Sequence, residues 1–157
     1  MEVNVKLNDY KYRYDVYHVF NIYFTLKKIN FFYVIGDYEI YIDDKSVTYK
    51  HEDRCVREEF NSIEKPKETI KKLIFRELKK LTGDIYPWGT LIGIRPSKIA
   101  LTHLKEGKND EEIRDIFMKE HYTMAEKSQI CIDVAKREAE YVNKDKKTIA
   151  IYIGMAF

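Results

Sequence analysis

The stretch IEKPKETIKKLIFRELKKLTG, residues 63–83, decides the fold, because its apolar residues are spaced differently from those that precede it. Isoleucines and leucines recur here every three or four positions, with lysines and glutamates between them, which predicts an amphipathic helix. Pro66 is tolerated in the first turn of such a helix, and Gly83 stands just past its expected end. The apolar positions are Ile63, Ile70, Leu73, Ile74, Leu78 and Leu81.

Before this helix, residues 1–60 read as strands. Apolar and polar residues alternate from Tyr10 to Leu26, which predicts a long strand or a bent pair with one aromatic face against a core. A second strand is expected over residues 29–35. Residues 38–42 and 47–49 flank the turn residues 43–46 and form an expected hairpin. The short connections imply antiparallel pairing.

After this helix the pattern remains helical, following an apolar, glycine-punctuated connection over residues 84–95. A short helix is expected from Pro96 to about Lys105, closing at Gly107. Asn109 with Glu112 forms a capping box for the next helix, and Thr123 with Glu126 forms another for a helix that reaches about residue 142.

The sequence therefore predicts an α+β fold, with an N-terminal antiparallel β-sheet followed by a bundle of about four helices. The expected divisions are a β subdomain (1–62), a helical subdomain (63–143) and a linker with a final strand (144–157). An apolar run that follows a polar linker normally opens a new domain. The ending thus predicts that the sequence is the front part of a larger protein.

Composition narrows the function classes. The net charge is +2, from 28 basic and 26 acidic residues that are interspersed, which argues against a dedicated nucleic-acid-binding module. Cys55 and Cys131 form no CxxC pair, so no zinc or iron–sulfur ligand set is expected in the chain. With neither a long apolar run nor a signal peptide in the sequence, a cytoplasmic protein without a membrane partner is expected. No catalytic motif is recognisable.

The segment PWGTLIGIRPSK, residues 87–98, is the unusual stretch, since it holds the only tryptophan and two of the three prolines. Arg95 and Lys98 would bracket a helix start, where unpaired N–H groups favour an anion such as a carboxylate or phosphate. Trp88 would then form an apolar wall. The alternative is a tight loop in which Trp88 plugs the core and Arg95 bonds to a carbonyl. Both interpretations stay open at this point.

This segment resembles the PWGxLxGIRPxK stretch of HemZ-type oxygen-independent coproporphyrinogen III oxidases, which are radical S-adenosylmethionine enzymes. Downstream, Ala135-Lys136-Arg137-Glu138 and the last strand, residues 151–157, look like the approach to that family's cluster motif. There the strand reads roughly YxGIPF and is followed by CxxxCxxC. Met155 and Ala156 depart from this pattern. The resemblance spans about residues 64–157.

The resemblance implies a parent oxidoreductase of haem biosynthesis that binds a 4Fe–4S cluster and S-adenosylmethionine and decarboxylates coproporphyrinogen III to protoporphyrinogen IX. The present chain would be a non-catalytic domain of it, holding no cofactor and packed against its own radical enzyme barrel. Tyr152 matches a tyrosine that lies beside the cofactor in related enzymes. Its alternative role is simply to form one face of a strand.

Three roles for the domain remain open. Arg95 and Lys98, with Trp88, would suit one propionate of the substrate. An RNA-binding or protein-docking role competes with this and would need a basic, aromatic surface. In the third, the domain is a structural brace.

Overall fold

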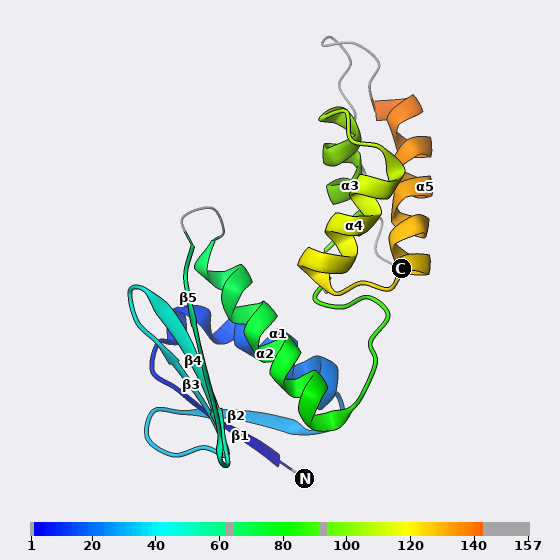
Figure 1. Cartoon of the computed structure of the whole chain (residues 1–157). Helices are drawn as coiled ribbons and strands as arrows, with labels where there is room; N and C mark the ends of the chain where they lie inside the picture. The colour runs from blue at the N-terminus through cyan, green and yellow to red at the C-terminus, as the bar shows by residue number, and fades with distance from the viewer. Residues whose placement is uncertain (1, 62–64, 92–93, 143–157) are drawn as a thin grey trace, which may run out of the picture.

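The structure, a computed structural model, describes residues 2–61, 65–91 and 94–142 (Figure 1). A five-stranded sheet and the helices α1 (Arg13–Tyr23) and α2 (Pro66–Thr82) form one unit, and three further helices form a second. In chain order the elements are β1 (Glu2–Leu7), η1 (Tyr10–Tyr12), α1 (Arg13–Tyr23), β2 (Lys28–Phe32), β3 (Tyr38–Ile42), β4 (Ser46–His51), β5 (Arg54–Glu59), α2 (Pro66–Thr82), α3 (Pro96–Lys105), α4 (Asp110–His121) and α5 (Ala125–Val142).

The sheet has the order β2-β1-β3-β4-β5. β1 runs parallel to both neighbours, with Val3 opposite Ile29 and Val5 opposite Tyr38, whereas β3, β4 and β5 form an antiparallel meander. The α+β class is confirmed. The sheet is mixed, which corrects the expectation of purely antiparallel pairing, because α1 carries the chain across from β1 to a parallel β2.

The strand predicted from Tyr10 to Leu26 is wrong, because the larger part of this segment is the helix α1. Its buried residues are Val16, Val19, Phe20 and Tyr23, a spacing that puts them on one helical face. The apparent alternation came from aromatic residues such as Tyr14 that are exposed.

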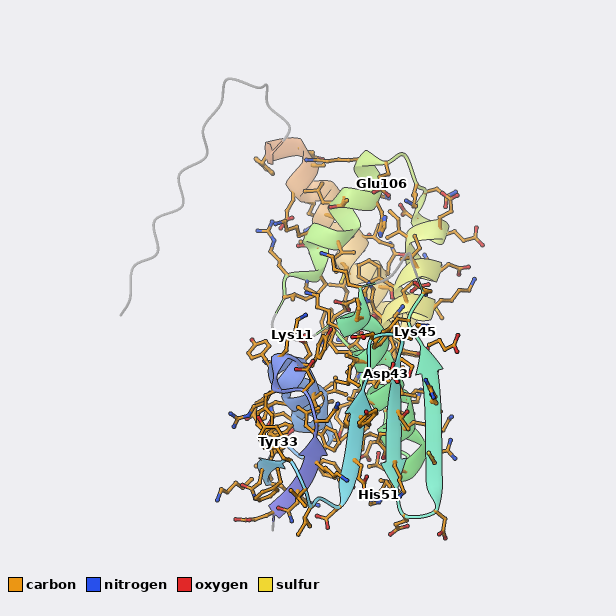
Figure 2. All side chains as sticks on the ribbon, turned by 90° about the vertical axis from the view of Figure 1, so that its left-hand side faces the viewer. Lys11, Tyr33, Asp43, Lys45, His51 and Glu106 are labelled. Atoms are coloured by element: carbon orange, nitrogen blue, oxygen red, sulfur yellow. The ribbon has the colours of Figure 1, made fainter. Side chains whose placement is uncertain are left out.

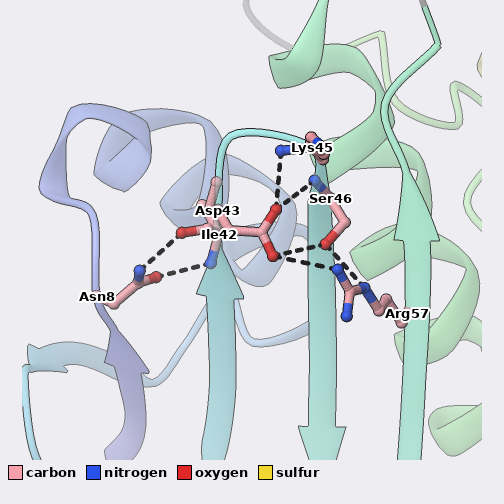
Figure 3. A network of polar contacts seen from close by, with 6 residues as sticks. All are labelled: Asn8, Ile42, Asp43, Lys45, Ser46 and Arg57. Carbon is pink, nitrogen blue, oxygen red and sulfur yellow. Dashed lines mark hydrogen bonds and ion pairs between the residues drawn. The ribbon is translucent and has the colours of Figure 1, made fainter.

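The hairpin expected around residues 43–46 is confirmed, and its turn lies at the end of the sheet nearer the three-helix unit, opposite His51 (Figure 2). The Asp43 carboxylate accepts backbone N–H groups from Lys45 at 2.8 Å and Ser46 at 2.7 Å (Figure 3). These bonds, foremost that from Lys45, lower the pKa of Asp43. Asn8 ties β1 to this corner, because its amide both accepts from and donates to the backbone of Ile42 at 2.8 Å.

α1 and α2 cover the same face of the sheet and share its core (Figure 1). The helix predicted from the 63–83 pattern is confirmed over Pro66–Thr82, with Pro66 in its first turn and Gly83 closing it in a left-handed conformation (φ +73°). Its residues Leu73, Phe75 and Leu78 are buried beneath the sheet. The subdomain boundary expected at residue 62 would place α2 with the later helices, whereas in the structure α2 shares its core with the sheet.

A second, separate core joins α3, α4 and α5, built around Leu101, Ile113, Phe117 and Ile132. The three predicted helices are confirmed, including α5 to Val142. Cys131 lies in this core.

Of the two expected capping boxes, the one at Asn109 is present, since its side chain and that of Glu112 each accept the other's backbone N–H. The one at Thr123 is wrong. Its hydroxyl oxygen is buried without a hydrogen-bond partner among the described residues, and α5 begins at Ala125 with the backbone of Met124 accepting from Ser128. The expected linker and final strand (144–157), with Tyr152, lie outside the described residues.

Candidate functional site

Residues 86–91 fold into two tight turns that lie against the junction between α4 and α5. We call residues 86–91 the motif loop. The Thr90 N–H donates to the carbonyl of His121 at 2.9 Å, and the Met124 N–H donates to the carbonyl of Pro87 at 3.0 Å. The loop is therefore fastened through its backbone on both sides of the α4–α5 connection.

Gly89 explains why this fastening needs a glycine. Its φ is +55°, and a Cβ atom built there would stand 1.9 Å from the backbone oxygen of His121. No side chain fits at that distance, and the left-handed conformation independently favours glycine. The imidazole of His121 is itself half-buried, and this partial burial lowers its pKa.

Trp88 lies on the surface, with 39% of its area exposed. The interpretation of Trp88 as a plug of the core is therefore wrong. Its ring lies under the ammonium group of Lys127, 5.4 Å from the centroid. It also lines a pocket of about 310 Å³ whose opposite wall is α1, with His18 and Ile22. The pocket brings Trp88 together with α1 and not with α3.

Arg95 and Lys98 do bracket the start of α3, as predicted. Arg95 is the N-cap residue, and its guanidinium group lies 3.7 Å from the carboxylate of Glu138. The hydroxyl of Ser97 donates to the other oxygen of that carboxylate at 3.3 Å. The Lys98 side chain is exposed, with no ion pair among the described residues. The anion nearest to this helix start is thus supplied by the chain itself.

Glu138 is the residue that the sequence reasoning missed. One of its carboxylate oxygens is buried and lacks a hydrogen bond among the described residues, with only the longer contact to Arg95. A signal was available, because Glu138 follows the buried Cys131 and Ala135 at helical spacing. An acid on the apolar face of a helix is unusual and indicates a partner.

The described residues contain no group of three or more histidines, cysteines or acids placed to hold a metal ion. Cys55 is exposed on the edge strand β5, and Cys131 is buried in α5. Burial raises the pKa of the Cys131 thiol, which disfavours the thiolate that binds metals. Within the same residues, no helix is long and apolar enough to cross a bilayer.

Comparison with known proteins gives one partial match. Over 119 residues, 74% of this chain, the sequence is 27% identical to the oxygen-independent coproporphyrinogen-III oxidase-like protein HemZ of Bacillus subtilis (strain 168). The resemblance inferred from the PWG segment is thereby confirmed. The chain spans 23% of the length of that relative. No family model matches the chain. No solved structure matches it either.

Proposed function

We propose that the chain is a non-catalytic domain of a radical S-adenosylmethionine protein that decarboxylates coproporphyrinogen III to protoporphyrinogen IX. The observation that carries this proposal is the match to the coproporphyrinogen-III oxidase-like relative, which covers 74% of the chain. In this proposal the domain packs against the radical enzyme barrel of the same protein.

The iron–sulfur cluster of such an enzyme does not fit the described residues. A radical 4Fe–4S centre takes several thiolates at one place. Cys55 and Cys131 belong to different units of the fold, and Cys131 is buried in the core of the three-helix unit. Their positions do not suit a shared cluster, so we assign no step of the radical chemistry to them.

The residues proposed to meet the substrate are Arg95 and Lys98, with Trp88 nearby in sequence. A propionate would pair with the exposed ammonium of Lys98 and compete with Glu138 for Arg95. Tyr152, proposed to lie beside S-adenosylmethionine, is carried by the resemblance alone.

The test uses the full-length protein that contains this chain. Arg95→Ala with Lys98→Ala should raise the KM for coproporphyrinogen about tenfold, because two charge-assisted contacts are lost, and leave the cluster absorbance unchanged. Lys108→Ala, which removes a cation paired with Glu106 at the other end of α3, is the matched control. An unchanged KM in the double variant would exclude propionate binding here.

The 157-residue chain reconstituted alone with iron and sulfide should acquire no cluster absorbance, and a bound cluster would contradict the non-catalytic role.

Protein docking is a second candidate, favoured by a run of exposed apolar side chains. Phe32, Tyr33, Val34 and Ile35 follow one another at the end of the edge strand β2, where Figure 2 labels Tyr33, whose ring lies 4.3 Å from that of Tyr10. Edge strands with exposed apolar side chains tend to pair or pack with another chain. Val34→Lys with Ile35→Lys should then weaken the contact between this domain and the barrel, seen as faster proteolytic release of the domain. Unchanged release would exclude this surface.

A further inference from the structure

A groove runs between α1 and the motif loop. His18, Asn21 and Ile22, which share one face of α1, line one side together with Thr25 just past the end of the helix. Residues 86–89 line the other side. Its volume is about 310 Å³, at the lower end of the range for small-molecule sites. We call this the α1 groove.

The walls of the α1 groove are flat and mostly apolar. Tyr86 is held in place by edge-to-face contact with Tyr23, with ring centroids 4.8 Å apart. Trp88 has Lys127 against its ring, which restrains the indole. Pro87 and Ile22 complete the apolar surface. Such walls match an aromatic ring.

One end of the groove is basic. A smaller cavity of about 170 Å³ adjoins it and shares His18, whose ring lies 4.1 Å from that of Tyr14. Lys67 and Lys71 of α2 line this cavity, together with Asp15. Lys71 is paired with Glu68 at 2.8 Å, whereas Lys67 is exposed and has no ion pair within the described part of the chain. Lys67 is therefore the cation available to a ligand.

We propose that the α1 groove binds a small aromatic carboxylate, with its ring against Trp88 and Pro87 and its carboxylate toward Lys67. Because Lys71 already has Glu68 as its partner, Lys67 is the cation of this lining that has no ion pair among the described residues. A single such cation suits a monoanion, and the nearby Asp15 would repel the second charge of a phosphate. The inference stands on the groove alone and does not require the proposed enzyme activity.

The probe pair is 2-naphthoate and 2-naphthamide, which share a two-ring body and differ in charge. Trp88 is the only tryptophan, so its indole N–H gives a single resonance in the spectrum of the nitrogen-15-labelled chain. Naphthoate should move that resonance with saturation, and naphthamide should bind about fivefold more weakly because it lacks the ion pair. Absence of any shift, or equal affinity of the two probes, would overturn the proposal.

Lys67→Ala should weaken naphthoate binding about fivefold and leave naphthamide binding unchanged. Lys79→Ala is the matched control, since Lys79 is an exposed lysine in the last turn of the same helix. It should leave the affinity for both probes as in the unmodified chain. Equal losses in the two lysine variants would show only a general charge effect and would refute the assigned site.

Discussion

Gly89 is the residue on which the motif loop depends. Gly89→Ala should lower the free energy of unfolding by about 2–4 kcal/mol, because the new Cβ would meet the His121 carbonyl and the backbone is left-handed. Gly83→Ala is the control, since its φ is +73° but nothing lies within 4 Å of the added Cβ. It should cost only about 1 kcal/mol. Urea unfolding followed by circular dichroism measures both, and equal costs would argue against the close approach at Gly89.

Glu77 is a fully buried carboxylate beneath the meander, held by Arg54 and by Lys80 at 2.9 Å. Burial raises its pKa, but the hydrogen bonds from Arg54 and Lys80 outweigh this and leave the pKa lowered. A lowered pKa means that the carboxylate adds stability above its unfolded pKa of about 4.3, and that this stability is lost as the pH falls through the folded value.

Glu77→Gln should therefore cost about 2–4 kcal/mol at pH 7, because Arg54, Lys80 and the more distant Arg76 lose a buried charged partner, and progressively less below about pH 4. Glu59→Gln, at an exposed position of β5, is the control and should change stability little at any pH. Denaturant unfolding at a series of pH values from about 3 to about 7, the range in which carboxylates titrate, gives the comparison. A loss that stays constant with pH would contradict the assignment.

At the scale of the element, Asn109 starts α4 through a reciprocal pair of hydrogen bonds with Glu112, at 3.0 Å and 2.8 Å. Asn109→Ala should cost about 1 kcal/mol, because the backbone N–H of Glu112 loses its side-chain acceptor. Asn109→Ser keeps a capping oxygen and should stay within a few tenths of a kcal/mol of the unmodified chain. Thermal unfolding measures both. Equal melting temperatures in the alanine and serine variants would show that the cap contributes nothing.

The elements that are predicted well from the sequence alone have residues at their ends that mark where they begin and stop. α2 has Pro66 and Gly83 at its ends, and the β3–β4 hairpin has Asp43, whose side chain closes the turn by itself. α1 lacks such marks, since its N-cap residue Tyr12 makes no side-chain capping bond. Its aromatic residues also face both core and solvent, so the period of 3.6 residues is hidden beneath an apparent period of two.

The limit of prediction from local sequence patterns is clearer still at the candidate site. The anion site expected at Arg95 was argued from local helix-start chemistry, which the structure retains. Local reasoning does not include Glu138, which lies 43 positions further along the chain (138 − 95) and which α5 places beside Arg95. The pairing of Trp88 with His18 across the α1 groove likewise depends on how α1 lies against the motif loop. The spacing of Glu138 on the apolar face of α5 indicates that it has a partner, but which residue that partner is follows from tertiary packing and leaves no local pattern.

On the scale of the whole molecule, the two cores meet through a small set of contacts. Tyr122, the last residue before the α4–α5 turn, stacks on Phe75 of α2 with ring centroids 5.5 Å apart. An ion pair joins Lys72 to Glu120 beside it. The backbone bonds between the motif loop and residues 121–124 complete the junction. With so few contacts, the three-helix unit can open before the sheet does.

Tyr122→Gly tests this arrangement. Glycine accepts the left-handed φ of +56° at this position, so the variant removes the ring without adding backbone strain. Loss of a partly buried ring, about 1 kcal/mol, should speed amide hydrogen exchange in α3–α5 about fivefold while the sheet amides stay protected. Tyr122→Phe retains the stacked ring and loses only the hydrogen bond of the hydroxyl with Arg76, so it should speed exchange less than Tyr122→Gly does. If the sheet amides accelerate in parallel with the helices, the two cores unfold as one cooperative unit and the junction is stronger than its contacts indicate.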